Sequence, residues 1–224
     1  MRYYPINLDL DGQPVLVIGG GEVATRKVEG LLEAGAKIRV IAPRVLPLLK
    51  KLAEKKRIRL ILRDYQKGDL DGIYLAVAAT DDTERNKLVH AEAKKAKILL
   101  NVVDRPELCN FVFPARINRG EFMVTVSTGG ASPALAKKVR EDLEGFFGPE
   151  YGALVSILEK LRKKFPPAKT SGADKLFTAL VRSPILQHLR QGDRGTVDRL
   201  LKSLFGEKVS ISSLGCKLEP RSSS

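Results

Sequence analysis

The fold is decided by one stretch near the start of the chain, which reads Val15-Leu16-Val17-Ile18-Gly19-Gly20-Gly21-Glu22-Val23-Ala24. Its four leading residues are apolar and stop abruptly at three glycines, a pattern typical of a buried parallel strand that ends in a tight turn. From Glu22 to Ala34, helix-forming residues carry an apolar stripe, and Gly35 suits the carboxyl end of a helix. The stretch therefore predicts a strand, a glycine turn and a helix in direct succession.

The glycine turn matches the pattern G-x-G-x-x-A, which binds the pyrophosphate of a dinucleotide when it lies between a strand and a helix. Gly19 can take the tight turn, Gly21 lets a phosphate approach the backbone, and Ala24 allows close helix packing. The start of the helix adds unpaired N–H groups and the positive end of a dipole. We therefore predict that a dinucleotide binds along Gly19, Gly20, Gly21, Glu22, Val23 and Ala24.

The rest of the first half alternates between strand and helix patterns. Strands are expected at 37–42, 58–62, 73–78 and 98–103, and helices at 44–56 and 81–96, the second of which opens with a capping box from Asp81 to Glu84. Because right-handed crossovers place helices on both faces of a sheet, this order predicts an α/β fold with a Rossmann-like parallel sheet.

The pattern changes beyond Pro106. It predicts hairpin strands at 111–117 and 122–127, a helix that starts at Ser132-Pro133 and runs to about Phe147, and further helices at 151–165, 175–181 and 196–204. The last residues, from about Glu207 to Ser224, are expected to be loosely held.

The end of the second strand bears on the choice of nucleotide. An Asp or Glu there would bind the ribose 2′-hydroxyl of NAD, but this strand ends in Val40-Ile41-Ala42-Pro43-Arg44. Pro43 and Arg44 are candidate nucleotide-binding residues, and the Arg44 guanidinium is suited to the 2′-phosphate of NADP. The residues themselves therefore leave NAD and NADP both open.

Composition excludes several classes of protein. With 43% hydrophobic and 29% charged residues, the chain is expected to be globular rather than disordered. It shows no apolar leader and no apolar run that could span a bilayer, so we expect a cytoplasmic protein without a membrane partner. Cys109 and Cys216 lie far apart without metal-ligand spacing, and His90 falls in mid-helix, where packing is expected. We therefore predict no disulfide and no metal site.

The chain is strongly basic, with a formal net charge of +13. The surplus is greatest in residues 151–224, which carry 14 Lys and Arg against 6 Asp and Glu. Such a surplus attracts polyanions, namely nucleic acid, an anionic membrane or a small substrate rich in carboxylates. An ordinary solvated surface is the alternative.

Four stretches, read together, resemble the precorrin-2 dehydrogenase family, which also forms the amino-terminal part of siroheme synthases. They are Gly19-Gly20-Gly21-Glu22-Val23-Ala24-Thr25-Arg26-Lys27, Ala78-Ala79-Thr80-Asp81-Asp82, Asn101-Val102-Val103-Asp104 running on to Pro114-Ala115, and Ser127-Thr128-Gly129-Gly130-Ala131-Ser132-Pro133. The resemblance covers about residues 3–147, and beyond these it is limited to helical character.

The resemblance implies a reaction and a domain organisation. In that family two hydrogens are removed from precorrin-2, a reduced tetrapyrrole rich in carboxylates, to give sirohydrochlorin, with NAD as acceptor. A homodimer is implied, and the carboxylates of the substrate suit the basic charge of this chain. The implied parts are an NAD-binding Rossmann domain at 1–113, a dimerisation segment of hairpin and helix at 114–149, and a helical domain with a loose tail at 150–224.

The resemblance also implies individual site residues in the first half. The catalytic carboxylate falls on Asp104, just past the fifth strand, at the edge where open α/β sheets bind their ligands. A turn aspartate paired with Arg105 is the alternative for this position. Thr80 and Asp81 would flank the nicotinamide ribose, and a helix N-cap is the alternative for Asp81.

The implied substrate site lies in the second half. Its candidate residues for holding the macrocycle and its carboxylates are Ser127, Thr128, Gly129 and Arg116. A plain strand-to-helix turn is the alternative for the loop, and surface solvation is the alternative for the arginine. Multifunctional relatives commonly have serine where this chain has Thr128, so no serine-specific role is implied there.

Two other functions stay open. Some relatives also insert ferrous iron, so a bifunctional dehydrogenase and sirohydrochlorin ferrochelatase is the first alternative. The second is a regulator that senses NADH and binds nucleic acid through its basic tail, but residues 151–224 lack helix-turn-helix spacing, which disfavours nucleic acid as a partner. G-x-S-x-G, Walker A and H-E-x-x-H motifs are absent, which argues against a hydrolase or an NTPase.

Overall fold

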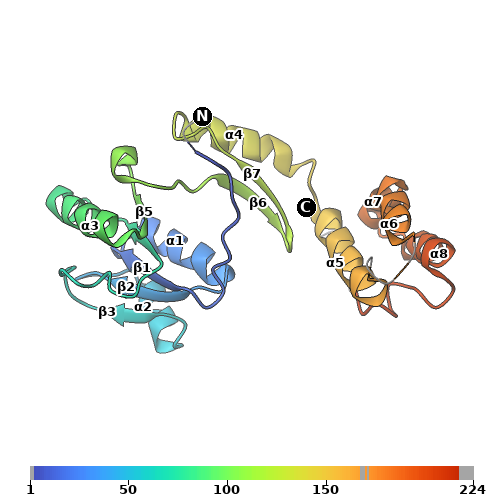
Figure 1. The fold of residues 1–224 in the computed structure, drawn as a ribbon, viewed down its shortest axis with the longest axis horizontal. Helices are drawn as coiled ribbons and strands as arrows, with labels where there is room; N and C mark the ends of the chain where they lie inside the picture. The colour runs from blue at the N-terminus through green and yellow to red at the C-terminus, as the bar shows by residue number, and fades with distance from the viewer. Residues whose placement is uncertain (1–2, 167–169, 171, 217–224) are drawn as a thin grey trace. The chain divides into compact units, whose positions relative to one another are not determined.

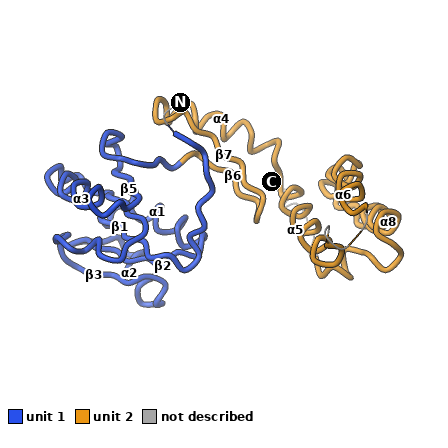
Figure 2. The backbone as a smooth tube through the Cα atoms, in the orientation of Figure 1, with its two compact units in different colours: residues 1–113 blue, residues 114–224 orange. Residues whose placement is uncertain are grey.

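The computed structural model describes residues 3–166, 170 and 172–216. The chain forms two compact units, residues 1–113 and residues 114–224, which are coloured separately in Figure 2. Each unit buries hydrophobic clusters of its own, as expected of independently packed domains.

The first unit is built on a five-stranded parallel sheet with the strand order β3-β2-β1-β4-β5 (Figure 1). Its elements are β1 (Pro14–Ile18), α1 (Glu22–Glu33), β2 (Lys37–Ile41), α2 (Pro47–Glu54), β3 (Arg59–Ile61), β4 (Leu75–Ala78), α3 (Thr83–Ala96), β5 (Leu99–Val102) and the short 3-10 helix η1 (Pro106–Leu108). This confirms the predicted α/β class and the Rossmann-like sheet. Because β2 and β4 lie on opposite sides of β1, the strand order reverses there, which is where such sheets bind ligands.

Helices cover both faces of this sheet because successive side chains of a strand point to opposite faces. Val15 and Val17 of β1 pack in one buried cluster with residues of α1 and α2. Leu16 and Ile18 pack in another cluster with Val89 of α3. Burial of such a side chain contributes about 1.5–3 kcal/mol, so a central strand that is apolar on both faces anchors the unit.

Two predicted helix starts in this unit are wrong. The helix predicted from Arg44 begins at Pro47, because proline favours the first helical turn and keeps the residue before it extended. The helix predicted from Asp81 begins at Thr83, and its N-cap is Asp82, whose carboxylate accepts from the backbone N–H of Arg85. Both shifts place more extended chain beyond the ends of β2 and β4.

The second unit consists of an antiparallel hairpin and five helices within its described residues (Figure 1). Its elements are β6 (Ala115–Arg119), β7 (Phe122–Val126), α4 (Pro133–Glu144), α5 (Pro149–Lys164), α6 (Ala173–Arg182), α7 (Ile185–Gln191) and α8 (Arg194–Phe205). Ser132 caps α4 as expected, since its hydroxyl accepts from the N–H of Leu135. The sequence pattern missed α7, which has only 7 residues.

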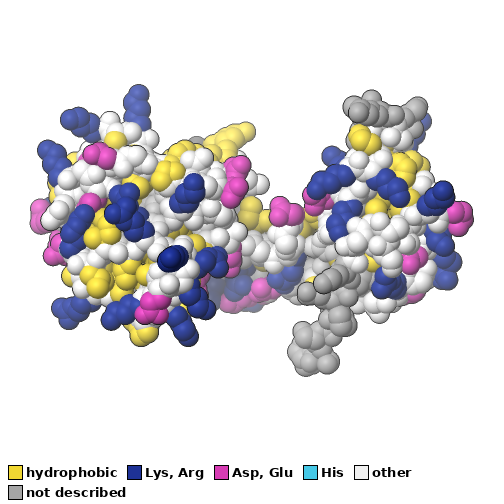
Figure 3. Space-filling view, turned by 90° about the horizontal axis from the view of Figure 1, so that it is seen from below, with side chains coloured by type: hydrophobic (Ala, Val, Ile, Leu, Met, Phe, Trp, Pro, Cys, Tyr) yellow, Lys and Arg dark blue, Asp and Glu magenta, His cyan; other side chains and the backbone are white. Residues whose placement is uncertain are grey.

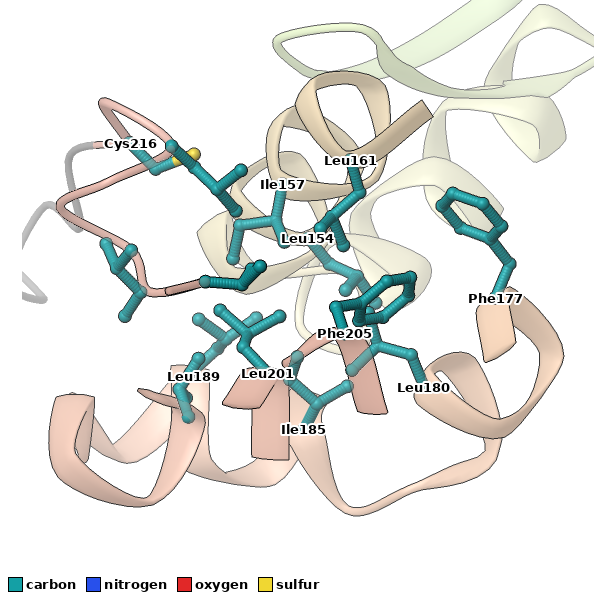
Figure 4. Packing of buried hydrophobic residues seen from close by; sticks show 14 of the residues in the cluster. Leu154, Ile157, Leu161, Phe177, Leu180, Ile185, Leu189, Leu201, Phe205 and Cys216 are labelled. Atoms are coloured by element: carbon teal, nitrogen blue, oxygen red, sulfur yellow. The ribbon is translucent and has the colours of Figure 1, made fainter. Parts of the chain in front are cut away.

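The prediction that the chain is loosely held from about Glu207 is wrong for residues 207–216. Val209, Ile211 and Leu214 are buried in one cluster with residues of α5, α7 and α8. Figure 4 shows Cys216 in the same cluster, on the side of Ile157. These apolar side chains outweigh the serines and glycines between them, so the segment packs as part of the helical core. The remainder of that predicted tail, residues 217–224, lies outside the described residues.

The surface bears basic groups throughout the face seen in Figure 3. Lys and Arg side chains on that face are scattered over each unit among acidic and apolar side chains rather than gathered in one stripe. Among the described residues, none of the helices has the length and apolar character needed to cross a membrane.

Candidate functional site

The glycine turn follows β1 and begins with a conformation reserved for glycine. Gly19 has a φ of +122°, which L residues with a side chain rarely adopt. A Cβ on Gly19 would lie 2.1 Å from the carbonyl oxygen of Ala79, which follows β4. The first glycine therefore lets β1 turn sharply against the end of β4.

The second and third glycines have different surroundings. A Cβ on Gly20 would lie 2.2 Å from the carbonyl oxygen of Arg44, and the Gly20 carbonyl accepts from the N–H of Leu46 at 2.9 Å. A Cβ on Gly21 would meet no atom within 4 Å. Gly20 is thus required by packing, whereas the space beside Gly21 is open to a ligand.

The open space lies at the start of α1. Gly21 is the N-cap of this helix and provides no side-chain cap, so the first backbone N–H groups of α1 remain available to an anion. Glu22 is exposed and Val23 half-buried, while Ala24 is fully buried against Val28. Ala24 therefore serves close helix packing, as its position in the motif predicts.

A hollow of about 200 Å³ adjoins the glycine turn at the carboxyl ends of β1, β2 and β4. Its lining residues are Ile18, Gly19, Gly20, Ile41, Ala42, Pro43, Arg44, Tyr65, Ala79, Thr80, Asp81 and Arg85. Six of the predicted nucleotide-binding residues are among them: Gly19, Gly20, Pro43, Arg44, Thr80 and Asp81. Gly21, Glu22, Val23 and Ala24 do not line it.

The Asp81 side chain does not cap the helix that follows it. The N-cap is Asp82, whose own N–H is accepted by the Thr80 hydroxyl at 3.2 Å. Asn86 donates to the Thr80 carbonyl at 2.9 Å and fixes this turn. The Asp81 carboxylate makes no hydrogen bond or ion pair with any residue that the structure describes, so the N-cap alternative for Asp81 is wrong.

Sequence reasoning missed Tyr65, which comes from the loop after β3. Its side chain is buried, and its hydroxyl donates to Glu92 of α3 at 2.5 Å. Burial and this hydrogen bond raise the pKa of Tyr65 above its ordinary value, so the phenol stays neutral. Arg63 and Asp69 fasten the same loop with two hydrogen bonds of 2.7 and 2.6 Å.

The hollow contains two arginines in different electrostatic situations. The Arg85 guanidinium, also missed from the sequence, lies 2.8 Å from a carboxylate oxygen of Asp64 and 3.3 Å from one of Asp82. Arg44 is exposed, and its guanidinium forms no hydrogen bond or ion pair within the described part of the chain. Arg85 is therefore largely neutralised, whereas Arg44 is available to an anionic ligand.

Asp104 lies just beyond β5, at the same sheet edge as the glycine turn. It is exposed and adopts a left-handed backbone with a φ of +58°. The predicted alternative, a pair with Arg105, is wrong: that guanidinium lies 3.3 Å from the Thr83 hydroxyl and 3.9 Å from a Glu107 carboxylate oxygen. Among residues 3–166, 170 and 172–216 the Asp104 carboxylate has no hydrogen-bonding or ion-pair partner.

The predicted substrate residues gather at one end of the hairpin in the second unit. Arg116 is exposed and pairs in register with Thr125, two residues before Ser127. The Thr128 hydroxyl donates to the Ser132 carbonyl at 3.0 Å and accepts from its N–H at 3.1 Å, so it closes the loop. Gly129, another of the predicted substrate residues, has a left-handed φ of +63°, and its N–H donates to the Ser127 hydroxyl. Both features shape the turn.

His90 and the two cysteines, which were considered as metal ligands, pack against neighbouring residues. The His90 Nδ1 lies 3.0 Å from the Leu108 carbonyl oxygen, which ties α3 to η1 and agrees with the packing role predicted for it. Cys109 and Cys216 are buried, and neither forms a disulfide bond within the described residues. The described residues contain no group of three or more His, Cys, Asp or Glu side chains that could hold a metal ion.

The geometry of the first unit fits a dinucleotide. Main-chain N–H groups at an uncapped helix start suit the negative charge of a pyrophosphate, and the missing Cβ of Gly21 leaves space for its approach. The hollow extends this site across the ends of three strands, where Asp81 and Arg44 can meet ribose groups.

Comparison with known proteins gives two family matches. Residues 6–115 match a family described as "Putative NAD(P)-binding", and residues 124–145 match "Sirohaem biosynthesis protein central". Siroheme synthase 3 of Aeromonas hydrophila is 38% identical over 93% of this chain, and siroheme synthase of Pseudomonas fluorescens is 37% identical over 90% of it. The chain spans 45% and 44% of these two proteins, which is about half of their length.

A solved structure is similar over nearly its whole length. This is SirC, a precorrin-2 dehydrogenase, with a TM-score of 0.74 and 29% sequence identity, and the match covers 90% of this chain and 98% of SirC. The likeness therefore extends beyond the nucleotide-binding unit.

Proposed function

Because the chain belongs to the family formed by precorrin-2 dehydrogenases and the amino-terminal region of siroheme synthases, we propose that it oxidises precorrin-2 to sirohydrochlorin with NAD as acceptor. One observation carries the proposal: an uncapped helix start with open space at Gly21 directly follows Gly19 and Gly20, which line a hollow at the ends of β1, β2 and β4. The match to SirC over both units supports the same substrate.

NAD bound at this site would supply the hydride acceptor for oxidation of the macrocycle. The residues of the chain bind the reactants and accept the proton. The N–H groups at the start of α1 would hold the pyrophosphate, and Thr80 and Asp81, which line the hollow, would meet the ribose on the nicotinamide side. Asp104 accepts the proton that the substrate loses together with the hydride, since its carboxylate is exposed and unpaired among the described residues.

Substrate carboxylates need cationic or N–H donors. Arg116 supplies a guanidinium at the end of the hairpin, and the Ser127–Gly129 loop supplies small residues beside it. We propose that residues 114–149 also form the dimer contact and that residues 150–224 form a separate helical part. Because the Thr128 hydroxyl both donates to and accepts from the Ser132 backbone, it is better suited to shaping this loop than to contacting the substrate.

The proposal is tested by an anaerobic assay in which precorrin-2 and NAD are mixed with the purified protein. We expect NADH and sirohydrochlorin to form in equal amounts. Asp104→Asn should lower the rate by about 100-fold or more while NADH binding is unchanged, as for the loss of a general base. Arg105→Ala, at the neighbouring position, should keep the rate. Absence of NAD-dependent sirohydrochlorin formation would refute the proposal.

The curated relatives favour a second candidate, since both are named siroheme synthase. Under this second candidate function, the chain also inserts ferrous iron into sirohydrochlorin. The test supplies sirohydrochlorin and ferrous iron without NAD and compares siroheme formation with and without the protein. Equal rates would exclude the second candidate and leave the dehydrogenase intact.

A further inference from the structure

The loop that contains Asp104 begins and ends on β5. This strand is at the edge of the sheet, so one row of its backbone N–H and carbonyl groups faces away from the other strands. After the loop, the chain returns to that row: the Leu100 N–H donates to the Asn110 side-chain oxygen at 2.7 Å, and the Leu100 carbonyl accepts from the Asn110 N–H at 3.0 Å. Residues 103–108 therefore form a loop whose two ends are fixed on the same strand.

The Cys109 side chain closes the base of this loop. Its sulfur accepts from the Val102 N–H at 3.1 Å and lies 3.2 Å from the Val102 carbonyl oxygen and 3.3 Å from that of Arg105. The thiol proton can be donated to either carbonyl. Val102 precedes Asp104 by two residues and Arg105 follows it directly, so one buried side chain bonds to the backbone on both sides of Asp104.

A second side chain holds the loop from α3. The Nδ1 atom of His90 lies 3.0 Å from the carbonyl oxygen of Leu108, which is the last residue of η1 and the neighbour of Cys109. A proton on Nδ1 makes this contact a hydrogen bond from the helix to the loop. The loop is thus attached both to β5 and to α3.

Asp104 depends on its backbone for its position. Its exposed carboxylate forms no hydrogen bond or ion pair with residues 3–166, 170 or 172–216, so no such contact in these ranges fixes it. Its left-handed φ of +58° is a conformation that persists only where the surrounding structure imposes it. A general base must lie within hydrogen-bond reach of the proton that it removes, and a misplacement of about 1 Å can lower a rate about 100-fold. The contacts that fix the loop therefore bear directly on catalysis by Asp104.

From these contacts we propose that Cys109 and His90 are positioning residues for the oxidation: they hold residues 103–108 so that the Asp104 carboxylate is fixed where it can take the proton of the substrate. The inference rests on the proposed catalytic role of Asp104 and extends it to two side chains that do not line the nucleotide hollow. Because both act through the backbone of the loop, their loss should slow the chemical step and leave nucleotide binding unchanged.

The test is steady-state kinetics of the full chain with precorrin-2 and NAD under anaerobic conditions. We expect Cys109→Ala to lower kcat about 10-fold or more and to leave KM and the NADH affinity within about 3-fold. Cys109→Ser keeps a group that donates and accepts, so it should recover most of the rate. Cys216→Ala is the matched control, since Cys216 is also buried but packs in the helical cluster of the second unit, and it should keep kcat. A kcat of Cys109→Ala equal to that of the wild type would overturn the inference.

The His90 variants give a second measurement that does not depend on how the Cys109 variants fold. The side-chain amide of asparagine can donate from about the place of Nδ1, whereas leucine has no donor. His90→Leu should therefore lower kcat about 3-fold or more, and His90→Asn should keep it near the wild-type value. Equal kcat values for these two variants would overturn the positioning role of His90.

A double variant distinguishes positioning from a general loss of structure. If Cys109 acts through Asp104, adding Cys109→Ala to Asp104→Asn should change kcat by less than about 2-fold, because the base that it positions is already gone. A further loss as large as that in the single variant would overturn the inference and leave the proposed function standing. Failure of the wild type to form sirohydrochlorin would instead overturn the proposed function.

Discussion

Replacing Gly21 with alanine separates ligand binding from folding at the glycine turn. The added methyl meets no protein atom within 4 Å, and the Gly21 backbone has a φ of −82°, which alanine adopts readily. Nothing in the fold opposes the substitution. The same methyl occupies the space through which a pyrophosphate would reach the N–H groups of α1, so only the nucleotide should be affected.

The magnitudes follow from these surroundings. Alanine is a poorer N-cap than glycine but restricts the unfolded chain, so the free energy of unfolding should change by less than about 1 kcal/mol. Loss of one or more charge-assisted hydrogen bonds should weaken NADH by about 10- to 100-fold. Gly19→Ala is the opposite case, because its φ of +122° and a contact of 2.1 Å with the Ala79 carbonyl oxygen oppose any side chain. It should cost about 3 kcal/mol or more.

Urea unfolding and NADH calorimetry on the same preparations measure both quantities. We expect Gly21→Ala to unfold like the wild type and bind weakly, and Gly19→Ala to unfold at lower urea. If Gly21→Ala bound NADH with wild-type affinity, the assignment of the pyrophosphate to the start of α1 would be refuted.

Three further outcomes are expected. Asp104→Ala should lower the free energy of unfolding by about 1 kcal/mol more than Asp104→Asn, since asparagine tolerates the left-handed backbone and alanine does not; equal urea curves would contradict this. The Arg63 hydrogen bond holds the pKa of Asp69 below its ordinary value, so this pair stabilises the fold above about pH 4 and its contribution is lost as pH falls through the lowered pKa. Asp69→Asn should therefore lower the urea midpoint at pH 6, and this effect should shrink as pH falls below about 4; an effect that does not change with pH would exclude the ion pair. Arg190→Ala should destabilise the second unit by about 2 kcal/mol, because it leaves the buried Glu150 carboxylate without its 2.6 Å partner, and an unchanged urea curve would show that this pair adds nothing.

The sequence predicts the central part of the nucleotide site because the signals there are local. A strand with four apolar residues before three glycines fixes β1, the turn and α1 within one short segment. Alternation of strand and helix then orders the remaining strands, so that Thr80 and Asp104 are expected at the same sheet edge as Gly19. These predictions need no knowledge of side-chain packing.

The errors come from interactions between segments far apart in the sequence. Tyr65, in the loop after β3, lines the hollow, and its hydroxyl donates a hydrogen bond to Glu92 of α3. The two residues are 27 positions apart in the sequence, so no local pattern encodes this contact. The 207–216 segment has a polar composition typical of a mobile tail, yet Ile211 and its apolar neighbours are buried by α5 and α8. Local composition predicts such segments poorly, because tertiary burial outweighs it.

Asp104 shows why a candidate residue must be judged on its side chain as well as its position. Aspartate is common in left-handed turns because its carboxylate can bond to nearby backbone groups, so the sequence alone suits a structural role equally well. Here the turn is formed without that help: the Arg105 N–H donates to the Val102 carbonyl, and the Asp104 carboxylate bonds to none of the described residues. A side chain that the turn does not use, at the edge where parallel sheets bind ligands, supports the catalytic role that we propose for Asp104.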